Sequence, residues 1–131
     1  MSKPTVLFLC QHNAGRSQLG AALLEILAGD RYTAQSAGLA PADTVNPAIA
    51  STVAELGLDI VDRTPREVTA ADLEQADIVI AMKPGLALPA APSGRFLEWT
   101  FPDPTDWSTE NVRPLREAVA ARIQSELLAG A

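Results

Sequence analysis

The sequence predicts an α/β fold: a single three-layer domain in which a four-stranded, mostly parallel sheet carries helices on both faces. Two observations lead to this prediction. Residues 5–9 (TVLFL) and 77–81 (DIVIA) are apolar runs without polar alternation, which is typical of strands buried on both faces. Segments with helical periodicity separate the candidate strands, and such alternation favours a parallel sheet. Ligands of these sheets bind beyond the carboxyl ends of the strands, near a topological switch point.

Two weaker segments complete the four strands. Residues 95–99 (RFLEW) are less apolar and suit a place nearer the edge of the sheet, and residues 32–36 are the weakest candidate. Residues 83–94 are rich in Pro and Gly, which indicates a loop within the domain. The expected order is strand, helix, strand, two helices, strand, loop, strand and helix.

Four helices are expected from apolar stripes and end signals. The first carries leucines and an isoleucine at 19, 23, 26 and 27 and stops at Gly29. The second covers residues 47–56 behind an Asn46 cap. The third is short and begins after Thr69, with Asp72 in its first turn. The last carries apolar residues from 112 to 127, and Pro114 is tolerated there only if the helix starts close to Asn111.

Length and composition exclude several classes of site and partner. At 131 residues the chain suits one domain spanning residues 1–131. One cysteine and one histidine exclude a disulfide framework and a Cys/His zinc cluster, so we expect no metal site. A net charge of −6 argues against a nucleic-acid partner. No apolar segment has the length of a signal peptide or a membrane span, so we expect a cytoplasmic protein without a membrane partner.

The segment CQHNAGRS (10–17) carries the clearest chemistry, because it links the first candidate strand to the first candidate helix. Ala14 and Gly15 allow a tight turn, so that backbone N–H groups converge on an anion at the positive end of the helix dipole. The Arg16 guanidinium suits two oxygens of a tetrahedral oxyanion. A thiol in this field ionises readily, so we interpret Cys10 as a nucleophile aimed at the central atom of the oxyanion.

Three neighbours of the thiol have expected roles. Ser17 is placed to donate its hydroxyl to the thiolate, and Asn13 can tie the loop to itself. His12 could gate the entry of a thiol or add a donor at the loop mouth, and the favoured interpretation is that it orders the loop through a backbone contact. The alternative for the whole segment is a buried structural cysteine beside an arginine that pairs with a carboxylate.

The nucleophile also needs a general acid that protonates the departing oxygen. Asp103 in FPDPTD (101–106) follows the 95–99 strand, and Pro104 fixes its turn, so we interpret Asp103 as this acid. Asp106 is the competing carboxylate, and turn formation or capping is its expected role.

Aromatic and basic residues near these segments are expected to be structural. Trp99, Phe101 and Trp107 flank the acid segment, and we expect them to pack beneath it rather than to form a substrate platform. Lys83 and Arg66 could extend the positive surface around the loop mouth, and the favoured interpretation is that they are exposed, solvated charges.

VLFLCQHNAGRSQ (6–18) resembles the start of the low-molecular-weight tyrosine phosphatase superfamily, and more closely that of its arsenate reductase branch. SAG (36–38), DIVIAM (77–82) and the Asp-Pro pair at 103–104 follow in the family's order. The resemblance spans nearly the whole chain, and its sharpest parts are residues 6–18 and the Asp-Pro pair. It implies the low-molecular-weight phosphatase fold.

The resemblance also implies a role for each matching residue. Cys10 is the nucleophile, Ser17 supports its thiolate, and Asp103 is the general acid. Arg16 and the loop amides bind the oxyanion, and the loop residues concerned are Gln11, His12, Asn13, Ala14 and Gly15.

Departures from the family pattern indicate which activity within the family the chain resembles. Phosphatases of the family usually carry Pro after the Arg-Ser pair and aromatic residues beside the Asp-Pro pair. This chain has Gln18 and Thr105-Asp106 there, so the phosphotyrosine-stacking surface is expected to be absent. Thioredoxin-coupled arsenate reductases use two further cysteines, and residues 82–92 contain none. The chain therefore resembles single-cysteine reductases that use a small thiol, mycothiol rather than glutathione, with a mycoredoxin or glutaredoxin-like protein.

The sequence therefore predicts an arsenate reductase without a tightly bound cofactor. Cys10 forms an arsenic adduct, and an external low-molecular-weight thiol takes the arsenic away. The alternative is a phosphomonoester hydrolase of the low-molecular-weight phosphatase type, with a cysteinyl-phosphate intermediate and water activated by Asp103. A third hypothesis is an oxyanion-binding module without turnover. Each hypothesis places an arsenate- or phosphate-like oxyanion in the loop.

Overall fold

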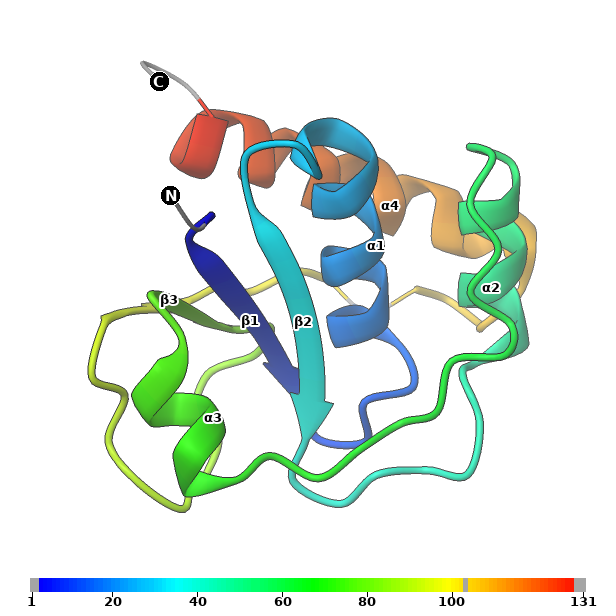
Figure 1. Cartoon of the computed structure of the whole chain (residues 1–131). Helices are drawn as coiled ribbons and strands as arrows, with labels where there is room; N and C mark the ends of the chain where they lie inside the picture. Colours follow the sequence, from blue (N-terminus) through cyan, green and yellow to red (C-terminus); the bar gives the residue numbers. More distant parts are fainter. Residues whose placement is uncertain (1–2, 103, 129–131) are drawn as a thin grey trace.

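Four parallel strands form the sheet, in the order β2-β1-β3-β4 (Figure 1). The computed structural model describes residues 3–102 and 104–128. Its strands are β1 (Thr5–Cys10), β2 (Thr33–Gly38), β3 (Ile78–Ala81) and β4 (Arg95–Glu98). The predicted α/β class with a four-stranded sheet is confirmed.

The helices follow the predicted order along the chain. They are α1 (Arg16–Ala28), α2 (Pro47–Ala54), α3 (Ala70–Gln75) and α4 (Thr109–Ile123), and a short π-helix, η1 (Gln124–Leu128), continues α4. The chain passes from β1 through α1 to β2 on one side of β1, and then through α2 and α3 to β3 on the other side. The carboxyl end of β1 is therefore a topological switch point, where sheets of this class bind ligands.

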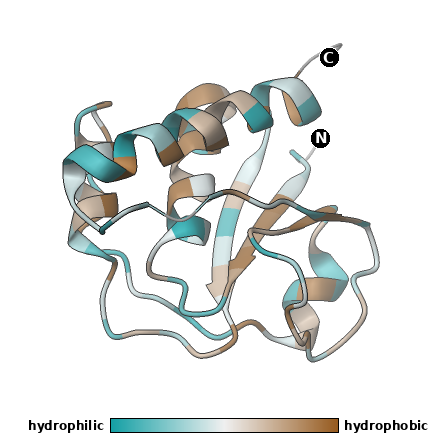
Figure 2. Ribbon diagram, turned by 180° about the vertical axis from the view of Figure 1, so that it is seen from behind, coloured by the Kyte–Doolittle hydropathy of each residue, from teal (hydrophilic) through white to brown (hydrophobic). Residues whose placement is uncertain are grey.

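Different elements cover the two faces of the sheet. On one face, Val6, Phe8 and Cys10 pack into a cluster with α1, α2 and α4. On the other face, Leu7 and Leu9 pack with Leu73 of α3 and with apolar side chains from residues 86–90, in the loop after β3. These five β1 side chains are buried, because successive residues of a strand point to opposite faces. Figure 2 shows hydrophobic colour along the inner strands and mixed colour along α4. Burial on both faces explains the apolar run at residues 5–9.

A glycine lets α1 approach the sheet closely. A Cβ atom at Gly20 would lie 2.6 Å from the Phe8 ring, so a larger residue at this position would push the helix away from β1. The Phe8 ring in turn meets Trp99 edge to face, with the ring centroids 6.3 Å apart. This packing fixes the first turn of α1 relative to the end of β1.

The predicted caps of α2 and α3 are present. The Asn46 side chain accepts a hydrogen bond from the Ala48 N–H at the start of α2, and Thr69 forms a reciprocal capping box with Asp72 at α3. The last helix was expected to tolerate Pro114 only with a start close to Asn111, and it starts two residues earlier, at Thr109.

The helix α4 begins at Thr109, because the Ser108 hydroxyl caps it by accepting from the Asn111 N–H at 3.2 Å. Asp106 accepts from the Ser108 N–H at 3.0 Å, which agrees with its expected turn or capping role. Pro114 consequently lies inside the helix, where it leaves one backbone carbonyl without its usual donor.

Glu55 joins α2 to α4. Its carboxylate accepts hydrogen bonds from Arg113 and Arg116, whose nitrogens lie 2.5 and 2.7 Å from its oxygens. These bonds, first from Arg113 and then from Arg116, lower the pKa of Glu55 from 4.5 to about 2. The ionised form of Glu55 is therefore stabilised by folding.

Replacing Glu55 by glutamine should lower the denaturant midpoint of unfolding at neutral pH. Because the folded-state pKa is depressed, this stabilisation is present above pH 4.5 and is lost as the pH falls toward about 2. The midpoints of the wild type and of Glu55→Gln should therefore converge over this range. Denaturant titrations at a series of pH values measure this convergence, and a difference that stays constant down to pH 2 would contradict it.

Candidate active site

Cys10 lies at the end of β1 and contacts the first turn of α1 through Ser17. The Cys10 Sγ is 2.8 Å from the Ser17 Oγ, and the Asn13 Nδ2 donates to the same Oγ at 2.8 Å. Because this oxygen already accepts a hydrogen bond from Asn13, the Ser17 hydroxyl hydrogen is available to the sulfur. Cys10 is 6% exposed, and Asn13 and Ser17 are fully buried. The Ser17 hydroxyl can therefore donate a hydrogen bond to the Cys10 sulfur.

Asn13 is itself held from two directions. Its Oδ1 accepts from the Arg66 backbone N–H at 2.9 Å and from the Gln18 Nε2 at 3.3 Å. Its φ of 50° is in the left-handed region, which asparagine adopts more readily than most residues. Asn13 therefore ties the loop to itself, as predicted. The sequence did not predict that Gln18 and the Arg66 backbone complete this network.

The segment after β2 turns the loop carbonyls away from the pocket. The N–H groups of Leu39, Ala40, Ala42 and Asn46 donate to the carbonyls of residues 10, 11, 12 and 14 at 2.7–3.3 Å. With these carbonyls engaged on the outer side, the loop can present its own N–H groups to the opposite side. The first N–H groups of α1 have no partners within the helix, and they add to the same field. This arrangement has the geometry that the sequence analysis expected of an anion-binding loop.

Gly38 is needed where β2 meets this loop. It pairs with Cys10 in the sheet, and a Cβ atom would lie 2.7 Å from the Asn13 N and 2.9 Å from the Gln11 O. Any side chain would displace the backbone of the 10–17 loop. This contact gives a physical reason for the glycine in the SAG motif (36–38).

A pocket of about 340 Å³ opens above Cys10. The residues that line it are Cys10, Gln11, His12, Ala14, Gly15, Arg16, Asn46, Lys83 and Trp107. Six of the predicted loop residues therefore share one pocket, while Asn13 and Ser17 are buried beneath it. The pocket is larger than a tetrahedral oxyanion needs, so its outer part has room for a second reactant.

Trp107 forms one wall of this pocket, contrary to the expectation that it packs beneath the acid segment. Its side chain is 42% exposed, and its ring lies 5.8 Å from the Arg16 guanidinium carbon. Trp99 does pack inside, with 1% exposure. Lys83 also lines the pocket and is more than a remote surface charge, whereas Arg66 forms an ion pair with Asp72 at 2.8 Å.

His12 contacts the segment after β2. Its Nδ1 lies 3.0 Å from the Ala40 carbonyl oxygen, which is the backbone contact that the sequence favoured. The side chain is nevertheless exposed and borders the pocket.

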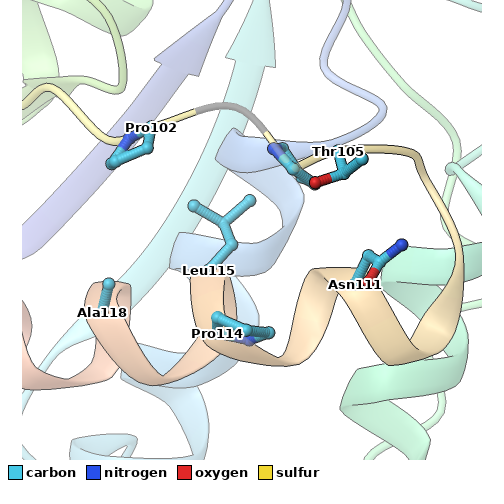
Figure 3. Close-up of a pocket in the computed structure, with 7 residues that line it drawn as sticks. Pro102, Thr105, Asn111, Pro114, Leu115 and Ala118 are labelled. Atoms are coloured by element: carbon cyan, nitrogen blue, oxygen red, sulfur yellow. The ribbon is translucent and has the colours of Figure 1, made fainter.

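Asp103, the predicted general acid, lies outside the described residues. Its neighbours Pro102, Pro104 and Thr105 border a separate pocket of about 310 Å³ against α4. Figure 3 shows Pro102 and Thr105 across from Leu115 and Pro114 of that helix. No charged side chain lines this second pocket within the described part of the chain.

Ser17→Ala should slow formation of the Cys10 adduct by about tenfold to a hundredfold. The reason is that a hydrogen bond to a charged group contributes about 1.5–3 kcal/mol. Rapid-quench measurement of the first turnover tests this, with Ser51→Ala on the exposed face of α2 as the matched control. Unchanged adduct formation in Ser17→Ala would show that this hydroxyl does not support the thiolate.

The described residues hold no group of three or more His, Cys, Asp or Glu side chains arranged for a metal ion. A search of residues 3–102 and 104–128 for helices of membrane-spanning length and hydropathy finds none.

Comparison with known proteins places this geometry in a family. The family model described as low molecular weight phosphotyrosine protein phosphatase matches residues 5–128. The arsenate reductase of Halalkalibacterium halodurans is 32% identical over 97% of this chain and 91% of its own.

Two solved structures share the fold. One is the thioredoxin-dependent arsenate reductase Cg_ArsC1' of Corynebacterium glutamicum, with a TM-score of 0.80 and 33% identity; the match covers 94% of this chain but 59% of that one. The other is an arsenate reductase in the phosphate binding state, with a TM-score of 0.81 and 27% identity; the match covers 93% of this chain and 95% of that one. The chain therefore belongs to the low molecular weight phosphotyrosine protein phosphatase family, in which these similar relatives are named arsenate reductases.

Proposed function

We propose that the protein is an arsenate reductase that passes arsenic from Cys10 to an external low-molecular-weight thiol. One observation carries this proposal: the hydrogen-bonded thiol at the base of the anion-binding loop is the single cysteine of the chain. Relatives named arsenate reductases support the oxyanion chemistry. Because there is no second cysteine, an intramolecular disulfide cannot complete the reaction.

The first half of the reaction forms an arsenic adduct. Arsenate would occupy the loop with the loop amides and Arg16 on its oxygens, and the Cys10 thiolate would attack the arsenic. An arsenic–oxygen bond breaks, and that oxygen leaves as water with a proton from Asp103. The product is Cys10–S–As(V), so arsenic has not yet been reduced.

The second half releases the enzyme. The sulfur of the external thiol attacks the arsenic, and the Cys10–arsenic bond breaks with its electron pair returning to Cys10. The released thiol–arsenic(V) conjugate is then reduced to arsenite by a mycoredoxin or glutaredoxin-like protein, which supplies the two electrons. We propose mycothiol rather than glutathione as the thiol. No tightly bound cofactor is required by these steps.

Asp103→Asn should slow adduct formation by roughly a hundredfold or more, because the oxygen would leave unprotonated. Phosphate binding should remain nearly unchanged, since a carboxylate contributes no attraction to an anion. Single-turnover kinetics and phosphate titration measure the two effects, and Asp106→Asn is the neighbouring control. Wild-type adduct formation in Asp103→Asn would remove Asp103 from the proton transfer.

A second candidate, phosphomonoester hydrolysis, is favoured by Trp107. This exposed ring borders the Cys10 pocket and offers an aromatic wall for an aryl phosphate. The residues beside the Asp-Pro pair predicted that no stacking surface is present, whereas Trp107 supplies an aromatic ring at the Cys10 pocket. Hydrolysis would pass through a cysteinyl-phosphate and would need no thiol.

A comparison of reductants tests both functions. Arsenate is supplied with glutathione, with mycothiol or with thioredoxin, each with its matching redoxin or reductase, and aryl phosphate hydrolysis is measured in parallel. We expect arsenite production with a small thiol and little with thioredoxin alone. Robust aryl phosphate hydrolysis without thiol-dependent arsenite release would assign the protein to the phosphatases. Phosphate binding without either reaction would favour the oxyanion-binding module.

A further inference from the structure

The hydrogen bond of His12 determines its neutral tautomer. The Ala40 carbonyl oxygen can only accept, so the His12 Nδ1, at 3.0 Å from it, carries the hydrogen. In the neutral ring the Nε2 is then left with a free lone pair. Within residues 3–102 and 104–128, Nε2 has no hydrogen-bond partner. The ring is therefore held by one nitrogen while the other is available to a reactant.

His12 also lies where the second reactant must enter. Its side chain is exposed and lines the same pocket as Cys10, Lys83 and Trp107. An oxyanion held by the loop would occupy the part of the pocket next to Cys10. A thiol that attacks from solvent would then pass through the outer part of the pocket, which His12 borders.

The other described residues of this pocket cannot serve as a base for that thiol. Arg16 and Lys83 are cationic at neutral pH, and Cys10 is engaged as the nucleophile. The remaining lining side chains, those of Gln11, Ala14, Gly15, Asn46 and Trp107, have no basic group. A carboxylate such as that of Asp103 is a much weaker base than an imidazole, and a thiol is a weak acid that needs the stronger one.

We propose that His12 is the general base of the second half-reaction. This inference rests on the proposed thiol transfer. The His12 Nε2 takes the proton from the S–H of the incoming thiol while that sulfur bonds to arsenic. The Cys10–arsenic bond breaks with its electron pair returning to Cys10. Arsenic stays As(V), so this step needs no oxidant or reductant, and the proton then passes from Nε2 to water.

The test uses two thiols of similar size and different acidity. Ethanethiol is almost entirely protonated at neutral pH, whereas 2,2,2-trifluoroethanethiol has a much larger thiolate fraction and needs a base less. His12→Asn is the informative variant, because the asparagine amide nitrogen can replace Nδ1 as donor to Ala40 while the basic Nε2 is lost. His12→Ala removes both groups. The kcat/KM for each thiol is measured at saturating arsenate from formation of the thiol–arsenic(V) conjugate, detected by mass spectrometry without a redoxin.

We expect His12→Asn to lower kcat/KM for ethanethiol by about a hundredfold and that for trifluoroethanethiol by a few-fold at most. An equal loss with both thiols, or wild-type kcat/KM for ethanethiol in His12→Asn, would assign His12 to loop ordering alone and overturn the base. If the wild-type protein forms no thiol–arsenic(V) conjugate with either thiol, the proposed function fails and the base fails with it. The two failures are thus distinguished by the wild-type rate.

Discussion

Cys10→Ser should lower arsenate turnover by about four orders of magnitude or more while leaving the fold intact. A serine hydroxyl is ionised far less than a thiol, so it is a poor nucleophile even beside the Ser17 hydroxyl and the loop amides. The substitution preserves size closely, and within residues 3–102 and 104–128 the Cys10 side chain makes one polar contact, with Ser17 at 2.8 Å. Arsenite production with a small thiol and redoxin measures the loss.

Phosphate binding by the same variant separates chemistry from folding. The loop amides and Arg16 remain in Cys10→Ser, so we expect phosphate to bind about as well as in the wild type. Calorimetric titration with phosphate and a thermal unfolding curve provide the two controls. Appreciable arsenate turnover in a folded Cys10→Ser protein would remove Cys10 from the mechanism.

Arg16→Lys should lower kcat for arsenate by about a hundredfold to a thousandfold. Removal of one oxyanion donor typically has an effect of this size on kcat, and lysine cannot reproduce the planar, two-pronged guanidinium. The Arg16 guanidinium also lies 5.8 Å from the Trp107 ring, and the lysine would lose most of this contact. Because lysine keeps the positive charge, the fall in kcat measures the contribution of the guanidinium geometry rather than that of the charge.

The matched control for this variant is Arg95→Lys at an exposed position of β4. Initial rates over a range of arsenate concentrations separate kcat from KM. Arg16→Lys activity within threefold of the wild type would mean that a positive charge alone is enough for the reaction. The paired N–H donors of the guanidinium would then have no role.

The central part of the site could be predicted because its signals are local. Cys10, Asn13 and Ser17 lie within eight consecutive residues that link a buried strand to a helix. The chemistry of such a junction follows from the backbone and the helix dipole. The same locality explains why the strand and helix order was predicted correctly from periodicity.

The parts that escaped prediction depend on contacts between distant segments. Arg66 reaches Asn13 across 53 residues, and residues 39–46 hold the outer side of the catalytic loop. Neither contact has a local sequence signal, since both require that β2 pair with β1 through to Gly38. Gln18 was noticed as a departure, but its bond to Asn13 depends on the turn that the loop adopts.

The position of Trp107 was predicted wrongly because it depends on how the segment before α4 meets the 10–17 loop. Pro114 favoured a start near Asn111 on local propensity. The Ser108 cap and the burial of Val112 and Leu115 outweigh the cost of a proline inside the helix. Ending the loop earlier leaves Trp107 exposed beside Gly15, where a Cβ atom would lie 3.5 Å from the indole ring.

The central claim is that arsenic leaves Cys10 on an external thiol before it is reduced. Its most direct test is mass spectrometry of the small molecules formed from arsenate, the protein and mycothiol without a redoxin, with glutathione in a parallel arm. We predict that a thiol–arsenic(V) conjugate accumulates beyond the molar amount of protein, and that arsenite follows when a mycoredoxin or glutaredoxin-like protein is added. Rapid arsenite formation with thioredoxin and its reductase alone, without a small thiol or a conjugate, would contradict the account.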